Sequence, residues 1–155
     1  MKRFDYDLAI IGGGSGGYAA ARTAAGAGLK TVVIEGGRNV GGLCILRGCM
    51  PTKALLYAAE VKHLAEHAAT WGLRAGRIGF DFARVMARKN LMIKDFADFR
   101  AQQLNAGKFK FIRAGARFLD PHTVELSISD SRRRFGSSIR SDSLLTAHPE
   151  LASSR

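Results

Sequence analysis

The chain has 155 residues, of which 46% are hydrophobic, so it is long enough to bury the core of one globular domain. Its formal net charge is +11, a surplus compatible with nucleic-acid or membrane binding and equally with a polyanionic ligand. Two cysteines are too few for a disulfide-stapled secreted scaffold. The N-terminus is a poor signal peptide, and no stretch approaches the roughly 20 apolar residues of a membrane span. We therefore expect a cytoplasmic protein without nucleic-acid or membrane partners.

The N-terminal quarter of the chain predicts a parallel crossover unit. The short apolar run over residues 6–11 ends at a glycine cluster, which is typical of a buried strand. The alanine-rich residues 16–27 predict a helix packed closely on a sheet, with Gly28 as its stop. Residues 31–35 predict a second strand. Strand, helix and strand at this spacing indicate an α/β fold with a Rossmann-like parallel sheet.

Two long helices and three short strands are expected next. Pro51 suits the first turn of a helix, and residues 52–69 carry apolar side chains at helical spacing. A second helix is expected from Asp81 to about Leu104. Short strands are predicted over residues 109–112, 116–119 and 123–126. The two helices would form an excursion between the crossover unit and these strands.

The composition changes at Ser127. Serine and arginine dominate residues 127–155 without apolar periodicity, which predicts disorder. Only Leu144 and Leu145 suggest a brief structured island. We therefore expect a domain over residues 1–126 and an atypical, disordered tail over residues 127–155.

A glycine cluster, residues 12–17, follows the first predicted strand. Gly12, Gly14 and Gly17 fit the pattern G-x-G-x-x-G. The first glycine allows a tight turn, the second lets the backbone approach a pyrophosphate, and the third lets helix and strand touch. Free N–H groups at the helix start then face the phosphates. Glu35 ends the second strand, where a carboxylate can accept hydrogen bonds from ribose hydroxyls. These residues predict a dinucleotide site.

Two cysteines, Cys44 and Cys49, are separated by four residues and could form a small disulfide ring if the chain turns there. Cys49 lies just before Pro51 and so near a helix N-terminus, which favours the thiolate form of a cysteine. Arg47 and Lys53 add positive charge that acts in the same direction. Such a pair can exchange with a disulfide or dithiol substrate.

Residues 41–53 resemble the signature of the class I pyridine nucleotide-disulfide oxidoreductases, with a glycine pair, two cysteines and then Pro51, Thr52 and Lys53. This family includes dihydrolipoamide dehydrogenase, glutathione reductase and mercuric reductase. The resemblance covers residues 4–126, and the ending of the motif is closer to the dihydrolipoamide dehydrogenase and mercuric reductase branch. Leu43 departs from the family pattern, since many members carry threonine there.

The resemblance implies roles for the matching positions. The ADP half of FAD would be held by Gly12, Gly14, Ser15, Gly16, Gly17 and Glu35. Gly41 and Gly42 would approach the pyrophosphate, and Lys53 would lie near the reactive nitrogen of the flavin. Cys49 would exchange electrons with the flavin, and Cys44 would attack the substrate. The backbone of Gly115 and Ala116 would meet the adenine.

The implied activity is electron transfer between NAD(P)H, FAD and a disulfide of Cys44 with Cys49, on a small-molecule or protein-bound disulfide or dithiol. Complete members of the family also carry an NAD(P)H-binding domain, and an interface domain that forms a homodimer. Neither is found in this sequence, nor is the Ala-Thr-Gly segment expected soon after Leu126. Our hypothesis is a truncated or frameshifted, catalytically incomplete flavin domain that retains FAD poorly.

Two alternatives remain open. The chain could be a dinucleotide-binding module without catalysis, in which the cysteines are inert packing residues. Alternatively, Cys44, Cys49, His63 and His67 lie near the spacing of a C2H2 zinc site, which with the positive charge would suggest nucleic-acid binding. We expect no metal site, because a zinc finger has no use for the glycine cluster.

Overall fold

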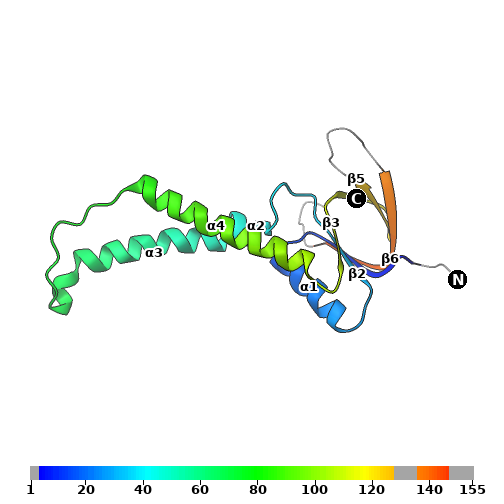
Figure 1. Cartoon of the computed structure of the whole chain (residues 1–155), viewed down its shortest axis with the longest axis horizontal. Coiled ribbons are helices and arrows are strands. Elements are labelled where there is room, and N and C mark those ends of the chain that lie inside the picture. Colours follow the sequence, from blue (N-terminus) through cyan, green and yellow to red (C-terminus); the bar gives the residue numbers. More distant parts are fainter. Residues whose placement is uncertain (1–3, 128–135, 147–155) are drawn as a thin grey trace.

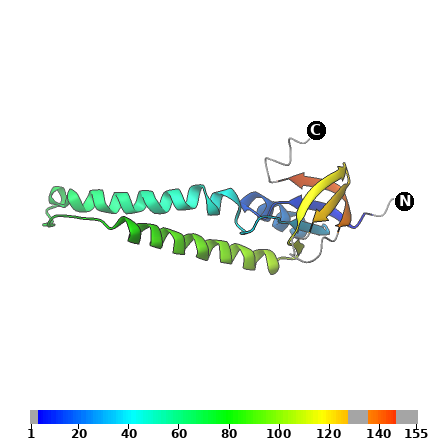
Figure 2. The same ribbon diagram turned by 90° about the horizontal axis from the view of Figure 1, so that it is seen from above.

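The structure is a computed structural model that describes residues 4–127 and 136–146, a sheet from which two long helices project (Figures 1 and 2). The strands are β1 (Tyr6–Ile11), β2 (Thr31–Ile34), β3 (Lys110–Ile112), β4 (Gly115–Asp120), β5 (Thr123–Ser127) and β6 (Gly136–Thr146). The helices are α1 (Ser15–Gly26), α2 (Gly42–Leu46), α3 (Cys49–Glu66) and α4 (Phe82–Asn105), with a 3-10 turn, η1 (Ala68–Trp71). In these residues the sheet has the order β3-β2-β1-β6-β5-β4.

Strands β1, β2 and β3 form a parallel sheet with both faces covered. β1 pairs in parallel with β2, and β2 pairs in parallel with β3. Side chains that alternate along β1 enter two different clusters. Ile10 packs with Ala21 of α1 and Leu104 of α4 on one face, whereas Ala9 packs with Val124 of β5 on the other. The continuous apolar sequence of β1 and β2 follows from this burial on both faces. The α/β, Rossmann-like fold predicted from the sequence is confirmed.

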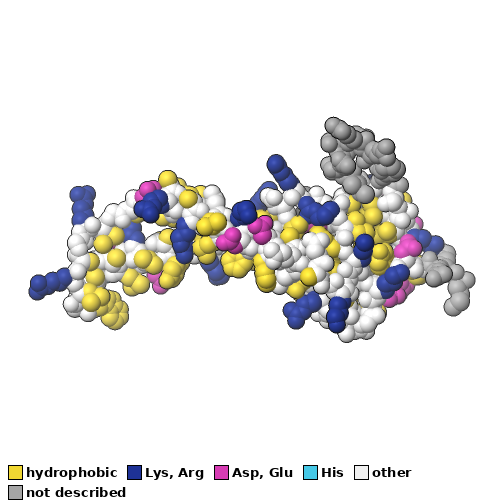
Figure 3. Space-filling model, viewed as in Figure 1, with side chains coloured by type: hydrophobic (Ala, Val, Ile, Leu, Met, Phe, Trp, Pro, Cys, Tyr) yellow, Lys and Arg dark blue, Asp and Glu magenta, His cyan; other side chains and the backbone are white. Residues whose placement is uncertain are grey.

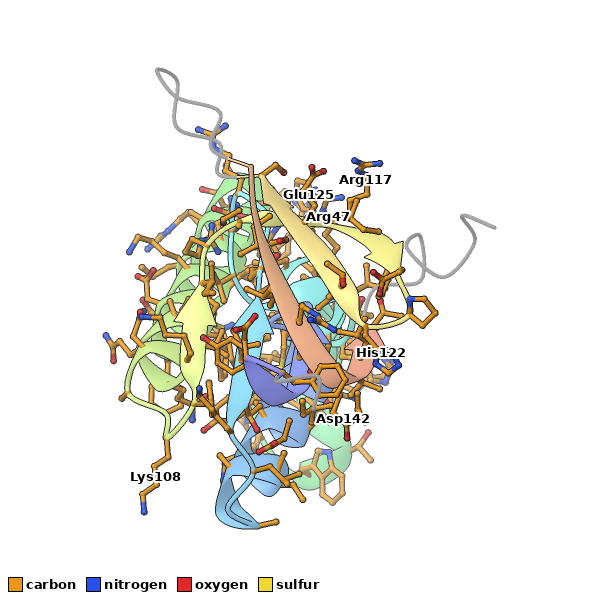
Figure 4. The ribbon with its side chains drawn as sticks, turned by 90° about the vertical axis from the view of Figure 1, so that its right-hand side faces the viewer. Arg47, Lys108, Arg117, His122, Glu125 and Asp142 are labelled. Carbon is orange, nitrogen blue, oxygen red and sulfur yellow. The ribbon has the colours of Figure 1, made fainter. Side chains whose placement is uncertain are left out.

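The C-terminal strands form an antiparallel meander that covers one face of the parallel strands. β4 pairs with β5, and β5 pairs with β6, both antiparallel. Arg117 on β4 and Glu125 on β5 point the same way and form an ion pair of 2.9 Å on the exposed face (Figure 4). At the other end of the hairpin, Nδ1 of His122 lies 3.1 Å from the carbonyl oxygen of Asp142. Because the ion pair between Arg117 and Glu125 is exposed, it contributes at most about 1 kcal/mol to the stability of the fold.

Strand β6 corrects the prediction that residues 127–155 are disordered. Residues 136–146 form one strand that pairs with β5 along its first half and with β1, in parallel, along its second half. Leu144 and Leu145, the predicted island, lie within it, and Ser127 belongs to β5. Serines do not prevent burial here, because the hydroxyl of the fully buried Ser141 donates to the carbonyl oxygen of Ser143 at 2.8 Å. The remainder of the predicted tail lies outside the described residues.

The two helices of the predicted excursion form an arm, which we define as α3, η1 and α4. At 1.5 Å per residue, α3 is about 27 Å long and α4 about 36 Å long. The helices contact each other, but much of their apolar surface is exposed, as the yellow patches along the arm show (Figure 3). Trp71, at the far end, is 72% exposed and Phe80 is 68% exposed. No helix in the described part of the chain is long and apolar enough to cross a membrane.

Candidate functional site

The turn after β1 has the close packing that the sequence predicts for its glycines. Gly12 adopts a φ of +108°, and its N–H donates to the carbonyl oxygen of Ile34 at 2.8 Å. Gly17, in the first turn of α1, lies directly against the carbonyl oxygen of Gly12, so a Cβ at this position would collide with that oxygen. The turn therefore brings the start of α1 onto the end of β1.

The N-terminus of α1 is open to a ligand. Gly14 is the N-cap, no side chain caps the helix, and the first turn contains no acidic residue. Ser15 and Gly16 are exposed, and a Cβ on Gly16 would have no heavy atom within 4 Å. The helix start therefore presents backbone N–H groups and the positive end of the helix dipole to open space. This arrangement fits an anionic group such as a pyrophosphate.

Glu35 links two glycine turns. Its Oε2 accepts a hydrogen bond from the N–H of Gly13 at 2.8 Å, and its Oε1 accepts one from the N–H of Gly37 at 2.6 Å. Each carboxylate oxygen keeps further acceptor capacity. The contact with a ribose therefore stays a prediction, while the structure adds a second role, since the carboxylate fixes the turn that contains Gly12.

The two glycine motifs meet each other. Gly42 has a φ of +65°, and a Cβ added to it would lie 2.7 Å from the Cα of Gly14. The reverse change, a Cβ on Gly14, would place that atom 3.2 Å from the Cα of Gly42. Gly41, which precedes this contact, is buried and forms the N-cap of α2. The backbones at the starts of α1 and α2 are therefore in contact, which places the second motif beside the first.

The two cysteines face each other across a tight turn. Cys44 lies within α2 and is half-buried, Cys49 is the first residue of α3 and is exposed, and both are free thiols. Gly48 connects them, and a Cβ at this position would lie 3.1 Å from the carbonyl oxygen of Leu43 and 3.4 Å from the Cα of Cys44. A larger residue would press on this turn, so Gly48 contributes to the close approach of the two cysteines.

The thiols interact with each other and with the glycine cluster. A hydrogen bond with the Cys49 side chain raises the pKa of Cys44 above its ordinary value, and partial loss of solvent acts in the same direction. The side chain of Ser15 also hydrogen-bonds to Cys44, and this contact acts to lower the pKa. Ser15 therefore connects the open start of α1 to the cysteine pair.

An arginine that the sequence analysis missed holds the loop after β2. Arg113 donates from one guanidinium nitrogen to the carbonyl oxygens of Gly37, at 2.6 Å, and Arg38, at 3.1 Å. Beside this clamp, Gly36 packs on Gly115, where an added Cβ on Gly36 would lie 2.9 Å from the Cα of Gly115. No motif singles out Arg113. Its role follows only from the position of β3 next to β2.

Two predicted cofactor residues lie apart from these contacts. Lys53 is the fifth residue of α3 and is exposed. The side chain of Ala116 packs against the core cluster that contains Val124 and Leu126. Any contact of Ala116 with a ligand would therefore involve its backbone, as the sequence analysis supposed.

The zinc-finger alternative is incompatible with the helix between its ligands. Cys49 and His63 lie on the same continuous helix, α3, and their positions are separated by about 21 Å along its axis. A tetrahedral zinc site holds its ligands at about 2.0–2.3 Å from the metal. Within the described residues, no group of three or more histidine, cysteine or acidic side chains is placed to hold a metal ion.

These features define an α/β protein in which a G-x-G-x-x-G turn contacts a pair of neighbouring thiols. The pyridine nucleotide-disulphide oxidoreductase family matches residues 6–148, and the chain belongs to this family. The match includes β6, so the similarity extends beyond the residues 4–126 inferred from the sequence.

The similar proteins include several dihydrolipoyl dehydrogenases. The chain is 38% identical to the dihydrolipoyl dehydrogenase of Bacillus subtilis over 117 residues, which is 76% of this chain and 24% of that protein. It is 47% identical to the enzyme of Chlorobaculum tepidum over 90 residues, 57% of this chain and 19% of that protein. The copper(II) complex of the HOCl-induced flavoprotein disulfide reductase RclA from Escherichia coli superimposes with a TM-score of 0.69 and 26% identity, covering 91% of this chain and 28% of that one. The chain thus spans about a quarter of the length of its relatives.

Proposed function

We propose that this chain provides the FAD-binding cradle and the redox dithiol of a disulfide oxidoreductase of the dihydrolipoyl dehydrogenase type. The observation that carries the proposal is the contact between the two motifs. Gly14, at the open start of α1, touches Gly42, two residues before Cys44. A ligand whose phosphates bind at α1 is thereby directed toward the thiols.

Different residues of the chain would bind different parts of FAD. The N–H groups at the start of α1 would bind the phosphates, and Glu35 would hold the ribose while it fixes the glycine turn. The clamp from Arg113 would keep the loop after β2 in position beside Gly115. When bound, FAD supplies two-electron transfer between a pyridine nucleotide and the cysteine pair.

The chemistry at the sulfurs is thiol–disulfide exchange. The disulfide of Cys44 and Cys49 takes up two electrons and two protons to give the dithiol seen in the structure. Cys44, having lost its proton, bonds to one sulfur of a substrate disulfide, and the other substrate sulfur leaves and takes up a proton. Cys49 then displaces the bound substrate sulfur and restores the protein disulfide. When these reaction steps run in reverse, a dithiol substrate is oxidised instead.

The wider assignments come from the resemblance and the relatives. The electron donor or acceptor would be NAD(P)H, the substrate a small-molecule or protein-bound disulfide or dithiol, and the complete enzyme a cytoplasmic homodimer. This chain would have little or no turnover by itself, because the relatives are about four times longer.

A reconstitution experiment tests the proposal. The full chain is titrated with FAD, flavin fluorescence is followed, and free thiols are counted after reduction and after oxidation by a disulfide. We expect weak but saturable binding of one FAD, in line with poor retention of the cofactor, and a gain of two thiols on reduction. The Cys44→Ser and Cys49→Ser variants are the matched controls, since each should keep one thiol in both states.

Two results would contradict it. A folded chain that binds no FAD would remove the cofactor assignment. A chain that binds FAD but shows two free thiols under both conditions would favour the dinucleotide-binding module without catalysis.

A further inference from the structure

Two histidines form a pair on the last turn of α3, away from the candidate site. His63 and His67 are four residues apart, which places them on the same helix face. Their ring centroids are 4.2 Å apart and the rings are tilted by 35°. Both residues are exposed. The position is about 21 Å from Cys49 along the helix, so the cysteine pair takes no part in it.

We propose that His63 and His67 form a two-histidine site for a divalent transition-metal ion of the class Ni²⁺, Cu²⁺ or Zn²⁺. Imidazole nitrogens are preferred ligands of these ions. With metal–nitrogen distances of about 2.0–2.1 Å, two neighbouring ligand nitrogens lie about 3 Å apart. Rings whose centroids are 4.2 Å apart reach this separation by a small rotation. Water fills the remaining coordination positions.

One ring nitrogen of His67 already has a backbone partner. Nδ1 of His67 lies 2.8 Å from the carbonyl oxygen of His63. When Nδ1 carries the proton, it donates to this oxygen and leaves the lone pair of Nε2 for the metal. Metal-bound histidines usually make such a hydrogen bond with their second nitrogen, which fixes the tautomer and the ring plane. The backbone carbonyl of His63 therefore accepts the hydrogen bond from the second ring nitrogen of His67.

The electrostatic environment favours a cation. His67 is the C-cap of α3, where the negative end of the helix dipole and carbonyl groups without helical partners lie. The acidic residue Glu66 directly precedes His67 in the sequence. The neighbouring positive charge of Lys62 is balanced, because its Nζ lies 2.6 Å from Glu66. A bound ion would thus fix the last turn of α3 at the far end of the arm.

Titration with Ni²⁺ tests the site. The full chain carrying Cys44→Ser and Cys49→Ser is used, because thiols bind the same ions. We expect one Ni²⁺ to bind with a Kd in the micromolar range by calorimetry and to raise the unfolding temperature. His63→Asn and His67→Asn should each weaken binding at least tenfold.

The matched control keeps the number of histidines and changes only their spacing. In a Leu64→His, His67→Asn protein, the two imidazoles are adjacent in sequence and point to different sides of the helix. This protein should bind as weakly as His67→Asn alone. Circular dichroism first establishes that each variant keeps its helix content. If His67→Asn loses helix content, His63→Asn is used in its place, because it leaves the C-cap residue unchanged. Equal Ni²⁺ affinity in the parent and the respaced protein, or no binding in the parent below about 1 mM, would overturn the proposal.

Discussion

The side chains around Cys44 decide how the dithiol behaves. The sequence predicted the pair and its place near a helix start, because both follow from spacing and from Pro51. It could not predict that the thiols would hydrogen-bond to each other or that Ser15 would reach Cys44, since these contacts depend on the turn at Gly48 and on the meeting of α1 and α2. The thiol of Cys49 therefore affects the pKa of Cys44 more than the sequence alone indicates.

Removing the second thiol should make Cys44 react at lower pH. The hydrogen bond with Cys49 is the largest cause of the raised pKa of Cys44, so in Cys49→Ala this pKa should fall toward its ordinary value and more thiolate should exist at a given pH. The measurement is the rate of iodoacetamide modification of Cys44 against pH, followed by mass spectrometry. The two proteins should give one common profile in concentrated urea. An unchanged or higher midpoint in the folded variant would contradict the prediction.

Arg113 should stabilise the loop that separates β2 from α2. In Arg113→Ala, we expect the free energy of unfolding to fall by about 1 kcal/mol, because two hydrogen bonds from a charged donor to loop carbonyls are lost at an exposed position. Urea unfolding measures this change, and FAD affinity should fall with it. Lys110→Ala, which removes an exposed cation nearby on β3, is the control and should change stability by less than about 0.5 kcal/mol. Equal effects of the two variants would count against the clamp.

At the scale of elements, the site depends on two helix starts that touch. The sequence predicted each glycine motif separately, because turn chemistry is local. The contact between Gly14 and Gly42 could not be predicted in the same way, since it depends on how α2 returns to the sheet after the loop that Glu35 and Arg113 hold. The close approach of α1 to α2 is therefore the feature that brings the two motifs together.

Filling this contact should separate the two helices. We expect Gly42→Ala to lower the free energy of unfolding by about 1–3 kcal/mol, because the position has a positive φ and the new Cβ would press on Gly14. Gly16→Ala is the matched control, since its Cβ has open space within α1, and it should be neutral or stabilising by up to about 1 kcal/mol. Urea unfolding of both variants gives the comparison. Similar losses in the two proteins would show that the contact does not matter.

At the scale of the whole molecule, the parallel core and the helical arm were predictable and the middle of the sheet was not. The apolar periodicity of β1, α1 and β2 reflects burial on two faces, so it is visible in the sequence. Strand β6 is rich in serine, and its backbone is paired by partners distant in sequence, such as Tyr6 opposite Ser141. Local composition therefore indicated disorder, whereas long-range pairing forms a strand.

Shortening the chain should test how much the sheet depends on β6. A chain that ends at residue 127 lacks the strand between β1 and β5, so we expect it to lose cooperative thermal unfolding. A chain that ends at residue 146 keeps the strand and should unfold with a single sharp transition. Circular dichroism during heating distinguishes the two proteins. Cooperative unfolding of the shorter chain at the same temperature would show that β6 is dispensable.

The position of β6 also affects how the protein is made. Where β6 meets the start of β1, the N–H of Arg140 donates to the carboxylate of Asp5, a residue 135 positions away. During translation, β1 leaves the ribosome early, yet its neighbour on one side is synthesised much later. Until then the nascent chain exposes an unpaired apolar strand edge, to which chaperones or other chains can bind. Completion of the sheet must therefore wait for one of its last segments to emerge, which favours slow maturation.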